Sequence, residues 1–199
     1  MKIGTDHKLT TRDKILKATL NIIGNEGFQN VTIRKIASMA KVNIASINYH
    51  FGSKDNIINE ALKFMNDKLI DSFKYLNDSE APLETRLRNF LRSYADTALE
   101  YPDVFRNFIS QCMNKPTITF EYIEFLKKEG LEKLKNTLQE NKCTEDDDVL
   151  FMKIFQMISG LDFPILLGSQ MKSFSNFDYK DKETRYKYIE LLLESVLCK

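Results

Sequence analysis

The chain has 199 residues, enough for one or two compact domains with a sizeable buried core. Lys and Arg total 29 against 28 for Asp and Glu, so the net charge of +1 indicates no polyanion partner for the chain as a whole. A hydrophobic fraction of 43% with 29% charged residues excludes a disordered or fibrous protein. Only 7 Gly and 4 Pro leave few turns, which disfavours β-sandwiches and Gly-rich phosphate loops and predicts an all-α fold.

Catalytic and metal-ligating residue types are scarce. The two histidines are His7 and His50, and the three cysteines, Cys112, Cys143 and Cys198, form no C-x-x-C pair. A zinc site needs three or four such ligands at short spacings, and a nucleophile needs a well-placed base. We therefore expect no metal, no cofactor and no enzymatic activity. The unpaired cysteines and the lack of an apolar leader in the first ten residues predict a cytoplasmic protein.

The charge and the aromatic residues are unevenly distributed. Residues 1–60 hold nine basic and five acidic residues, whereas the remainder is mildly acidic. Only three of the aromatic residues precede residue 61. A first module that binds a polyanion and a second that binds something apolar would explain both trends, although basic patches are also common as solvated faces.

Apolar residues recur at helical spacing along the chain, and Ser, Thr and Asn stand where helices would begin. The expected N-cap residues are Thr10 or Thr11, Thr32, Asn43 and Ser53. Thr144 together with Asp147 resembles a capping box at the start of a later helix. About nine helices are predicted, over residues 11–25, 33–40, 44–49, 54–73, 83–100, 102–114, 119–141, 144–171 and 182–197. The eighth should bend at Pro164, and Asp162 should cap a segment restarting there or else face a dimer or effector.

Residues 32–51 read as a helix, a three-residue turn and a second helix: TIRKIASMA, KVN and IASINYH. Ala37 and Ala40 supply small side chains where two steeply crossing helices touch, and Val42 fills the corner. Such a second helix fits the major groove of DNA, with its outer face at the base edges. The predicted DNA-binding residues are Thr32, Arg34, Asn43, Ile44, Ala45, Ser46, Asn48, Tyr49, His50 and Lys54.

Within this set, small neutral side chains on the second helix would read bases, and Asn48 is suited to an adenine edge. The hydroxyls of Thr32 and Tyr49, together with His50 and Lys54, would contact phosphates. For His50 the alternative is a surface histidine without such a role.

Residues Thr11 to about Leu62 resemble the DNA-binding domain of the TetR family of bacterial transcriptional regulators. The resemblance rests on GNEGFQNVT, TIRKIASMAKVN and ASINYHFGSKDNI, about a quarter of the chain. It implies an all-helical homodimer with a helix-turn-helix domain over residues 1–54 and an effector-binding and dimerisation domain over 55–199. Three positions depart from the usual pattern: Lys41 replaces a turn Gly, Ile44-Ala45 replaces a Lys-Gly pair, and Asn48 replaces an aromatic residue.

The resemblance also indicates where an effector and a second copy would bind. Aromatic and Met residues at helical spacing, which are otherwise typical core residues, suggest a neutral apolar ligand. Candidate effector-binding residues are Phe73, Tyr94, Phe105, Phe108, Cys112, Met113, Tyr122, Phe125, Met152 and Phe155. Candidate dimer-interface residues in the last two helices are Ile158, Gly160, Phe163, Tyr186, Ile189, Leu193 and Val196.

The expected function is therefore sequence-specific transcriptional regulation, with a repressor released from a palindromic DNA operator by a small apolar effector. Two alternatives remain open at this stage. One is a DNA-binding architectural or cell-cycle factor without an effector, and the other is a helical carrier of an apolar molecule. No membrane partner is expected.

Overall fold

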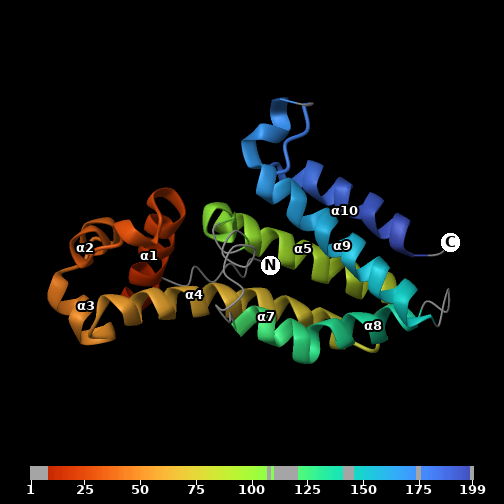
Figure 1. The fold of residues 1–199 in the computed structure, drawn as a ribbon, viewed down its shortest axis with the longest axis horizontal. Helices are drawn as coiled ribbons and strands as arrows, with labels where there is room; N and C mark the ends of the chain where they lie inside the picture. Colours follow the sequence, from red (N-terminus) through yellow and green to blue (C-terminus); the bar gives the residue numbers. More distant parts are fainter. Residues whose placement is uncertain (1–8, 107–108, 110–120, 141–145, 174–175, 198–199) are drawn as a thin grey trace, which may run out of the picture. The chain divides into compact units, whose positions relative to one another are not determined.

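The structure, a computed structural model, describes residues 9–106, 109, 121–140, 146–173 and 176–197 (Figure 1). Every secondary-structure element in these ranges is helical, which confirms the predicted all-α fold. The chain divides into two compact units, residues 1–64 and 65–199. Helix α4 (Lys54–Asp71) contributes to both units, and each unit is described separately below.

The amino-terminal unit contains α1 (Thr11–Glu26), the short 3-10 turn η1 (Phe28–Asn30), α2 (Ile33–Ala40), α3 (Ile44–Phe51) and the first part of α4. Thr10 begins α1 with a capping box, because its hydroxyl accepts a hydrogen bond from the Asp13 amide at 3.1 Å while the Asp13 carboxylate accepts from the Thr10 amide. Apolar residues from α1, α2, α3 and the first part of α4 form one small core. Its fully buried members include Ile15, Leu16, Leu20, Ile22, Ile23, Ile36, Ile47 and Ile57.

The carboxy-terminal unit is larger. Its elements are η2 (Ser72–Asn77), α5 (Leu83–Glu100), α7 (Glu121–Phe125), a π-helical segment η3 (Leu126–Gly130), α8 (Leu131–Gln139), α9 (Asp147–Leu167), η4 (Gly168–Ser173) and α10 (Lys182–Val196). Helix α5 is the central element, since it packs against η2, α9 and α10 (Figure 1). α9 also packs against α8 and α10.

Aromatic side chains make up much of this second core. The Phe73 ring lies edge-on to Phe90 at 4.7 Å and to Phe125 at 4.9 Å between centroids. Tyr94 extends the cluster, with its ring 6.1 Å from Phe90 and 6.5 Å from Phe105. Edge-to-face pairs of this kind stabilise a core by about 1 kcal/mol each beyond burial alone.

Several predicted helix details are corrected by the structure. The fourth α-helix ends at Asp71 and continues as 3-10 turns to Asn77, and the helix predicted over 119–141 contains the π segment. α9 begins after Asp146, not Thr144, because the Asp146 carboxylate accepts from the amides of Asp148 and Val149 at 2.9 and 3.0 Å. Most of the helix predicted over 102–114 lies outside the described residues.

Asp162 does not cap a restarted segment, because α9 runs unbroken from Asp147 through Asp162 and Pro164 to Leu167. Instead the Asp162 carboxylate accepts a hydrogen bond from the Tyr94 hydroxyl of α5 at 3.1 Å. The partner of this carboxylate is thus on another helix, which local sequence preferences cannot indicate.

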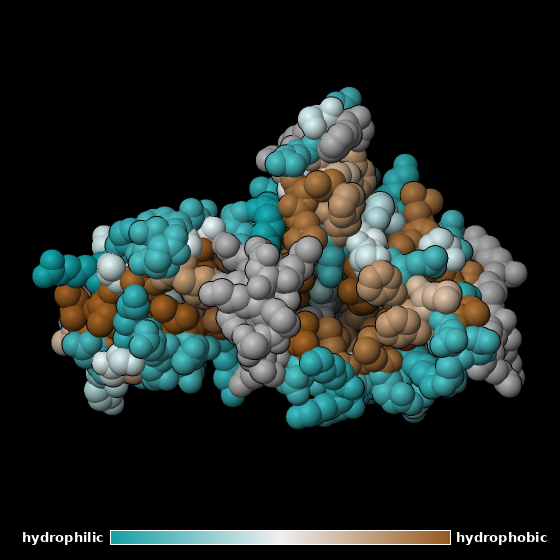
Figure 2. All heavy atoms as spheres, in the orientation of Figure 1, coloured by the Kyte–Doolittle hydropathy of each residue, from teal (hydrophilic) through white to brown (hydrophobic). Residues whose placement is uncertain are grey.

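α9 has an unusual surface. Among the described residues it is the one helix long and apolar enough to match a membrane span by length and composition, and 33% of that stretch is buried. Figure 2 shows apolar side chains reaching the surface along α9. The exposed apolar residues on it are Val149, Phe151, Met152, Phe155 and Phe163. Core helices of soluble proteins match the same criteria, so the open apolar face is the feature that needs an explanation.

Candidate nucleic-acid interface

The turn between α2 and α3 fixes the angle at which the two helices cross. Lys41, which replaces the turn Gly of the TetR pattern, adopts the left-handed conformation (φ 56°, ψ 47°). The next amide, that of Val42, donates to the Ala37 carbonyl at 3.1 Å. Ala37 and Ala40 are 8% exposed. Holding Lys rather than Gly in this conformation costs about 1 kcal/mol.

Helix α3 begins with a side-chain cap and has one buried side. The Asn43 carbonyl oxygen Oδ1 accepts a hydrogen bond from the Ser46 amide at 2.6 Å. Ile47 and Phe51 are 1% and 5% exposed and anchor the helix to the small core. The opposite side is therefore free to contact another molecule.

That opposite side carries the residues predicted to read DNA. All ten predicted DNA-binding residues are exposed, except Ser46, which is half-buried. On α3 the exposed face begins with Ile44 and Ala45 and continues one turn later with Asn48 and Tyr49, whose side chain is 86% exposed. Residues four apart lie on one side of a helix, so these four form a single strip.

The cations of the amino-terminal unit differ in whether they already form an ion pair with a carboxylate. Lys35 forms an ion pair with Glu26, and Arg12 pairs with Glu60. Arg34 and Lys54, by contrast, are exposed and make no ion pair within the part of the chain that the structure describes. Arg34 and Lys54 are thus the cations of the predicted set that remain free for phosphate groups.

A tight connection places Lys54 at the start of α4. Gly52 has φ 72°, and its amide donates to the Asn48 carbonyl at 3.0 Å, which ends α3. Ser53 then caps α4 by accepting from the Asn56 amide at 3.2 Å, and the Asn56 side chain donates back to the Phe51 carbonyl at 2.9 Å. Lys54 is the first helical residue after this cap, at a helix N-terminus that also favours phosphate.

Lys41 and Met39 were not among the predicted contacts, although both are exposed beside the turn. Lys41 makes no ion pair among the described residues, and Met39 is 47% exposed. The place of Lys41 in the turn between α2 and α3 was the available signal, since the residue is exposed there.

The predicted effector residues do not form one site. Phe73, Tyr94 and Phe105 are buried at 1% exposure or less, and Phe125 is half-buried beside them. Met152 and Phe155 are instead 60% and 66% exposed on α9. The side chains of Phe108, Cys112, Met113 and Tyr122 lie outside the described residues.

The predicted dimer residues also fall into two groups. Ile189, Leu193 and Val196 of α10 are buried within the protomer. Phe163 is 59% exposed, whereas Ile158, Gly160 and Tyr186 are partly exposed. Gly160 serves α9–α10 packing inside the protomer, since a Cβ there would lie 3.0 Å from Leu192 and its carbonyl accepts from the Tyr188 hydroxyl at 2.9 Å.

Comparison with known proteins agrees with this architecture. Residues 15–61 match the family model described as bacterial regulatory proteins of the tetR family. The amino-terminal helix-turn-helix unit therefore has the DNA-binding domain found in bacterial transcriptional regulators of the tetR family.

Relatives extend the likeness beyond the amino-terminal unit. The transcriptional repressor NicS of Pseudomonas putida is 23% identical over 94% of this chain and 91% of its own length. The nucleoid occlusion factor SlmA of Photobacterium profundum is 26% identical over 93% of this chain and 95% of its own. The structure of the ketosteroid regulator KstR2 of Mycobacterium tuberculosis shares the fold, with a TM-score of 0.70 and 17% identity over 96% of each chain.

Proposed function

We propose that this protein is a repressor that binds a palindromic DNA operator as a homodimer and leaves it when a small molecule binds the carboxy-terminal unit. The observation that carries the DNA-binding part is the exposed strip on α3, together with the free cations Arg34 and Lys54 on the helices that precede and follow α3 in the chain. Small neutral groups suit base edges, whereas cations without internal partners suit phosphates.

The homodimer is supported by the apolar face of α9. A second protomer seated there would bury Phe151, Phe155 and Phe163, which otherwise face water. A membrane is a poorer explanation, because α9 also carries Asp162 and Lys153, whose side chains bond to Tyr94 and to the Val196 carbonyl inside the protomer. Two-fold symmetry then places two copies of α3 against a palindromic site.

Release by an effector follows from linkage. A ligand that binds one conformer better must shift the protein toward it, and DNA affinity changes by the same coupling factor. An apolar effector would have to open the packed cluster around Phe73, Tyr94 and Phe105, since these side chains are already buried.

The proposal is tested by titrating the purified protein with DNA that flanks its own gene, at two salt concentrations. Saturable binding to one short palindrome, tighter than to random DNA by ~10³ or more, is the expected result. Weak binding with a steep salt dependence and no preferred sequence would show charge attraction alone and refute the proposal.

A second candidate is an effector-independent DNA-binding factor, favoured by the 26% identity to a nucleoid occlusion factor over almost the whole chain. Mapping the bound sites on the chromosome separates the two. A repressor should occupy one or a few promoter sites, whereas an effector-independent factor of this kind should occupy many dispersed sites.

A further inference from the structure

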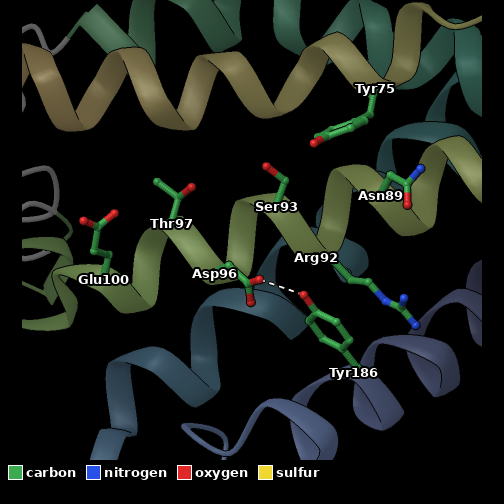
Figure 3. A pocket seen from close by; sticks show the side chains of 8 residues that line it. All are labelled: Tyr75, Asn89, Arg92, Ser93, Asp96, Thr97, Glu100 and Tyr186. Carbon is green, nitrogen blue, oxygen red and sulfur yellow. Dashed lines mark hydrogen bonds between the residues drawn. The ribbon is translucent and has the colours of Figure 1, made fainter. Parts of the chain in front are cut away.

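A groove of about 510 Å³ lies over α5 in the carboxy-terminal unit (Figure 3). One turn of η2 and one of α10 form its edges, through Tyr75 and Tyr186. α5 forms its floor with Asn89, Arg92, Ser93, Asp96, Thr97 and Glu100. The volume is within the range of ~300–1,000 Å³ for small-molecule sites. None of the residues predicted to bind an effector lines it.

The lining has an unusual composition for a helical domain. All eight side chains are polar, and the tyrosine rings are the only large apolar surfaces among them. On this side of α5, where a helix in a core would carry apolar residues, the side chains instead carry hydrogen-bonding groups. A purely apolar ligand would leave these groups without water or partners, which is costly.

The charges in the groove are already paired with each other or with neighbouring residues. Asp96 accepts from the Arg185 guanidinium and from the Tyr186 hydroxyl, each at 2.7 Å. Arg92 donates through Nη2 to Glu190 at 2.8 Å and covers the Tyr186 ring at 4.3 Å, and Lys68 donates to Glu100 at 2.6 Å. A charged ligand therefore gains little here, because each charged side chain already has an opposite charge beside it. The buried Nε–H of Arg92, which has no acceptor among the described residues, is open to a neutral hydroxyl group.

Apart from Tyr186, the uncharged side chains of the groove have, by contrast, no hydrogen-bond partners among the described residues. Asn89, Ser93, Thr97 and the Tyr75 hydroxyl make no side-chain hydrogen bond to any residue that the structure describes. Asn89, Ser93 and Thr97 are spaced four residues apart, so they form one row with ~6 Å between members. In Figure 3, Ser93 and Thr97 project from α5 on the side that faces Tyr75.

We propose that this groove binds a neutral, polyhydroxylated small molecule, a sugar or polyol or the sugar part of a nucleoside, and that this molecule is the effector of the proposed repressor. A row of amide and hydroxyl groups offers both donors and acceptors at the spacing of helical turns, which matches several hydroxyls on one ligand. The Tyr75 and Tyr186 rings offer flat surfaces for its C–H faces. The effector role rests on the proposed function, whereas binding itself does not.

Binding is tested on the full-length protein without DNA, by calorimetry and ligand-observed NMR with glucose, ribose, myo-inositol and adenosine. At least one should bind with a Kd of ~1 mM or tighter. Stronger binding of adenosine than of ribose would identify a nucleoside, and the reverse a free sugar. Gluconate and glucose 6-phosphate should bind at least ~10-fold more weakly than glucose if glucose is bound. No binding by any neutral compound would overturn the inference.

Variants locate the site. Ser93→Ala combined with Thr97→Val removes two hydroxyls at nearly constant volume and should weaken binding ~10-fold or more. Thr85→Val is the matched control, because Thr85 is on the same helix outside the groove and its substitution should leave affinity unchanged. Equal affinity in the double variant and the wild type would place the ligand elsewhere and overturn the inference; circular dichroism confirms that both variants are folded.

The effector role has its own readout. The bound compound should weaken operator binding of the wild type ~10-fold, and the double variant should respond only at proportionally higher concentrations. Groove binding without any change in DNA affinity would refute the effector role. Absence of specific DNA binding would refute the proposed function instead, with the groove measurements still valid.

Discussion

The Tyr94 hydroxyl donates a hydrogen bond to the Asp162 carboxylate at 3.1 Å, which joins the middle of α5 to the middle of α9. Tyr94 is 1% exposed. Burial raises the pKa of Asp162 from 3.8 to about 7, although the hydrogen bond from Tyr94 works in the opposite direction. Desolvation of the carboxylate thus outweighs its one hydrogen bond.

This pair predicts an unusual pH dependence of stability. Because the folded protein holds the Asp162 proton more tightly than the unfolded chain, stability should fall as pH rises from about 4 to about 7 and level off above. The slope from this group is at most ~1.4 kcal/mol per pH unit. Asp162→Asn, which stays neutral, should remove this component. Urea unfolding at several pH values measures it.

The control for this prediction is Ser159→Ala, at an exposed and uncharged position on the same helix. Because no titratable group is changed, its stability should vary with pH as that of the wild type does. If Asp162→Asn also ran parallel to the wild type across that window, Asp162 would titrate at its ordinary pKa and the prediction would be wrong.

Asn48 is predicted to read one base pair. Removing its amide in Asn48→Ala should cost about 1–3 kcal/mol on the preferred operator and relax the preference at that position. Binding to operators substituted at single base pairs, measured for wild type and variant, gives the result. An unchanged base preference in the variant would exclude Asn48 as a reader.

Arg34 and Lys54 should behave differently, since they are predicted to contact phosphate. Arg34→Ala and Lys54→Ala should each weaken binding to all sequences alike and reduce the slope of log affinity against log salt by about one. Lys35→Ala is the control, because Lys35 is already paired with Glu26 and should change the slope less. Equal slopes for all three variants and the wild type would contradict the assignment.

Features that involve residues close together in the sequence were predictable, whereas contacts between distant residues were not. Thr10, Thr32, Asn43 and Ser53 cap their helices as the sequence indicated, because a cap involves residues three positions apart. The partner of Asp162 is 68 residues away, so no local pattern could reveal it. The groove over α5 was not predicted either, because residues of η2, α5 and α10 that are far apart in the sequence form it together.

The sequence also does not distinguish apolar residues buried within the protomer from those exposed on its surface. Ile189 and Phe163 look alike as apolar residues at helical spacing, yet one is fully buried in the protomer and the other is 59% exposed. Periodicity indicates that a residue faces something apolar. It does not say whether the neighbour is a helix of the same chain or of a second copy.

The strip on α3 predicts recognition of thymine methyl groups. Ile44 is 43% exposed and is followed by the exposed Ala45 at the start of the helix. Apolar side chains in the major groove contact the thymine methyl. Replacing single operator thymines by deoxyuridine should cost about 1 kcal/mol where a methyl is contacted, and Ile44→Ala should reduce that penalty. An operator insensitive to deoxyuridine at every position would exclude such contacts.

The exposed face of α9 predicts a dimer that a single charge disrupts. Phe155 is 66% exposed, and its ring stacks on Phe151 at 6.4 Å between centroids, so the two present one apolar surface. In a two-fold dimer Phe155→Lys would bury two unpaired charges, one from each protomer. The variant should therefore shift from dimer to monomer. Sedimentation velocity measures this shift.

The matched control is Leu191→Lys, on α10, where Leu191 is 59% exposed and was not among the predicted interface residues. It should remain dimeric. Because a single copy of α3 reaches one half-site, the Phe155→Lys monomer should also lose operator affinity by ~100-fold or more, with the fold intact by circular dichroism. A Phe155→Lys protein that still sedimented as a dimer would place the interface elsewhere, and the exposed face of α9 would then need another partner.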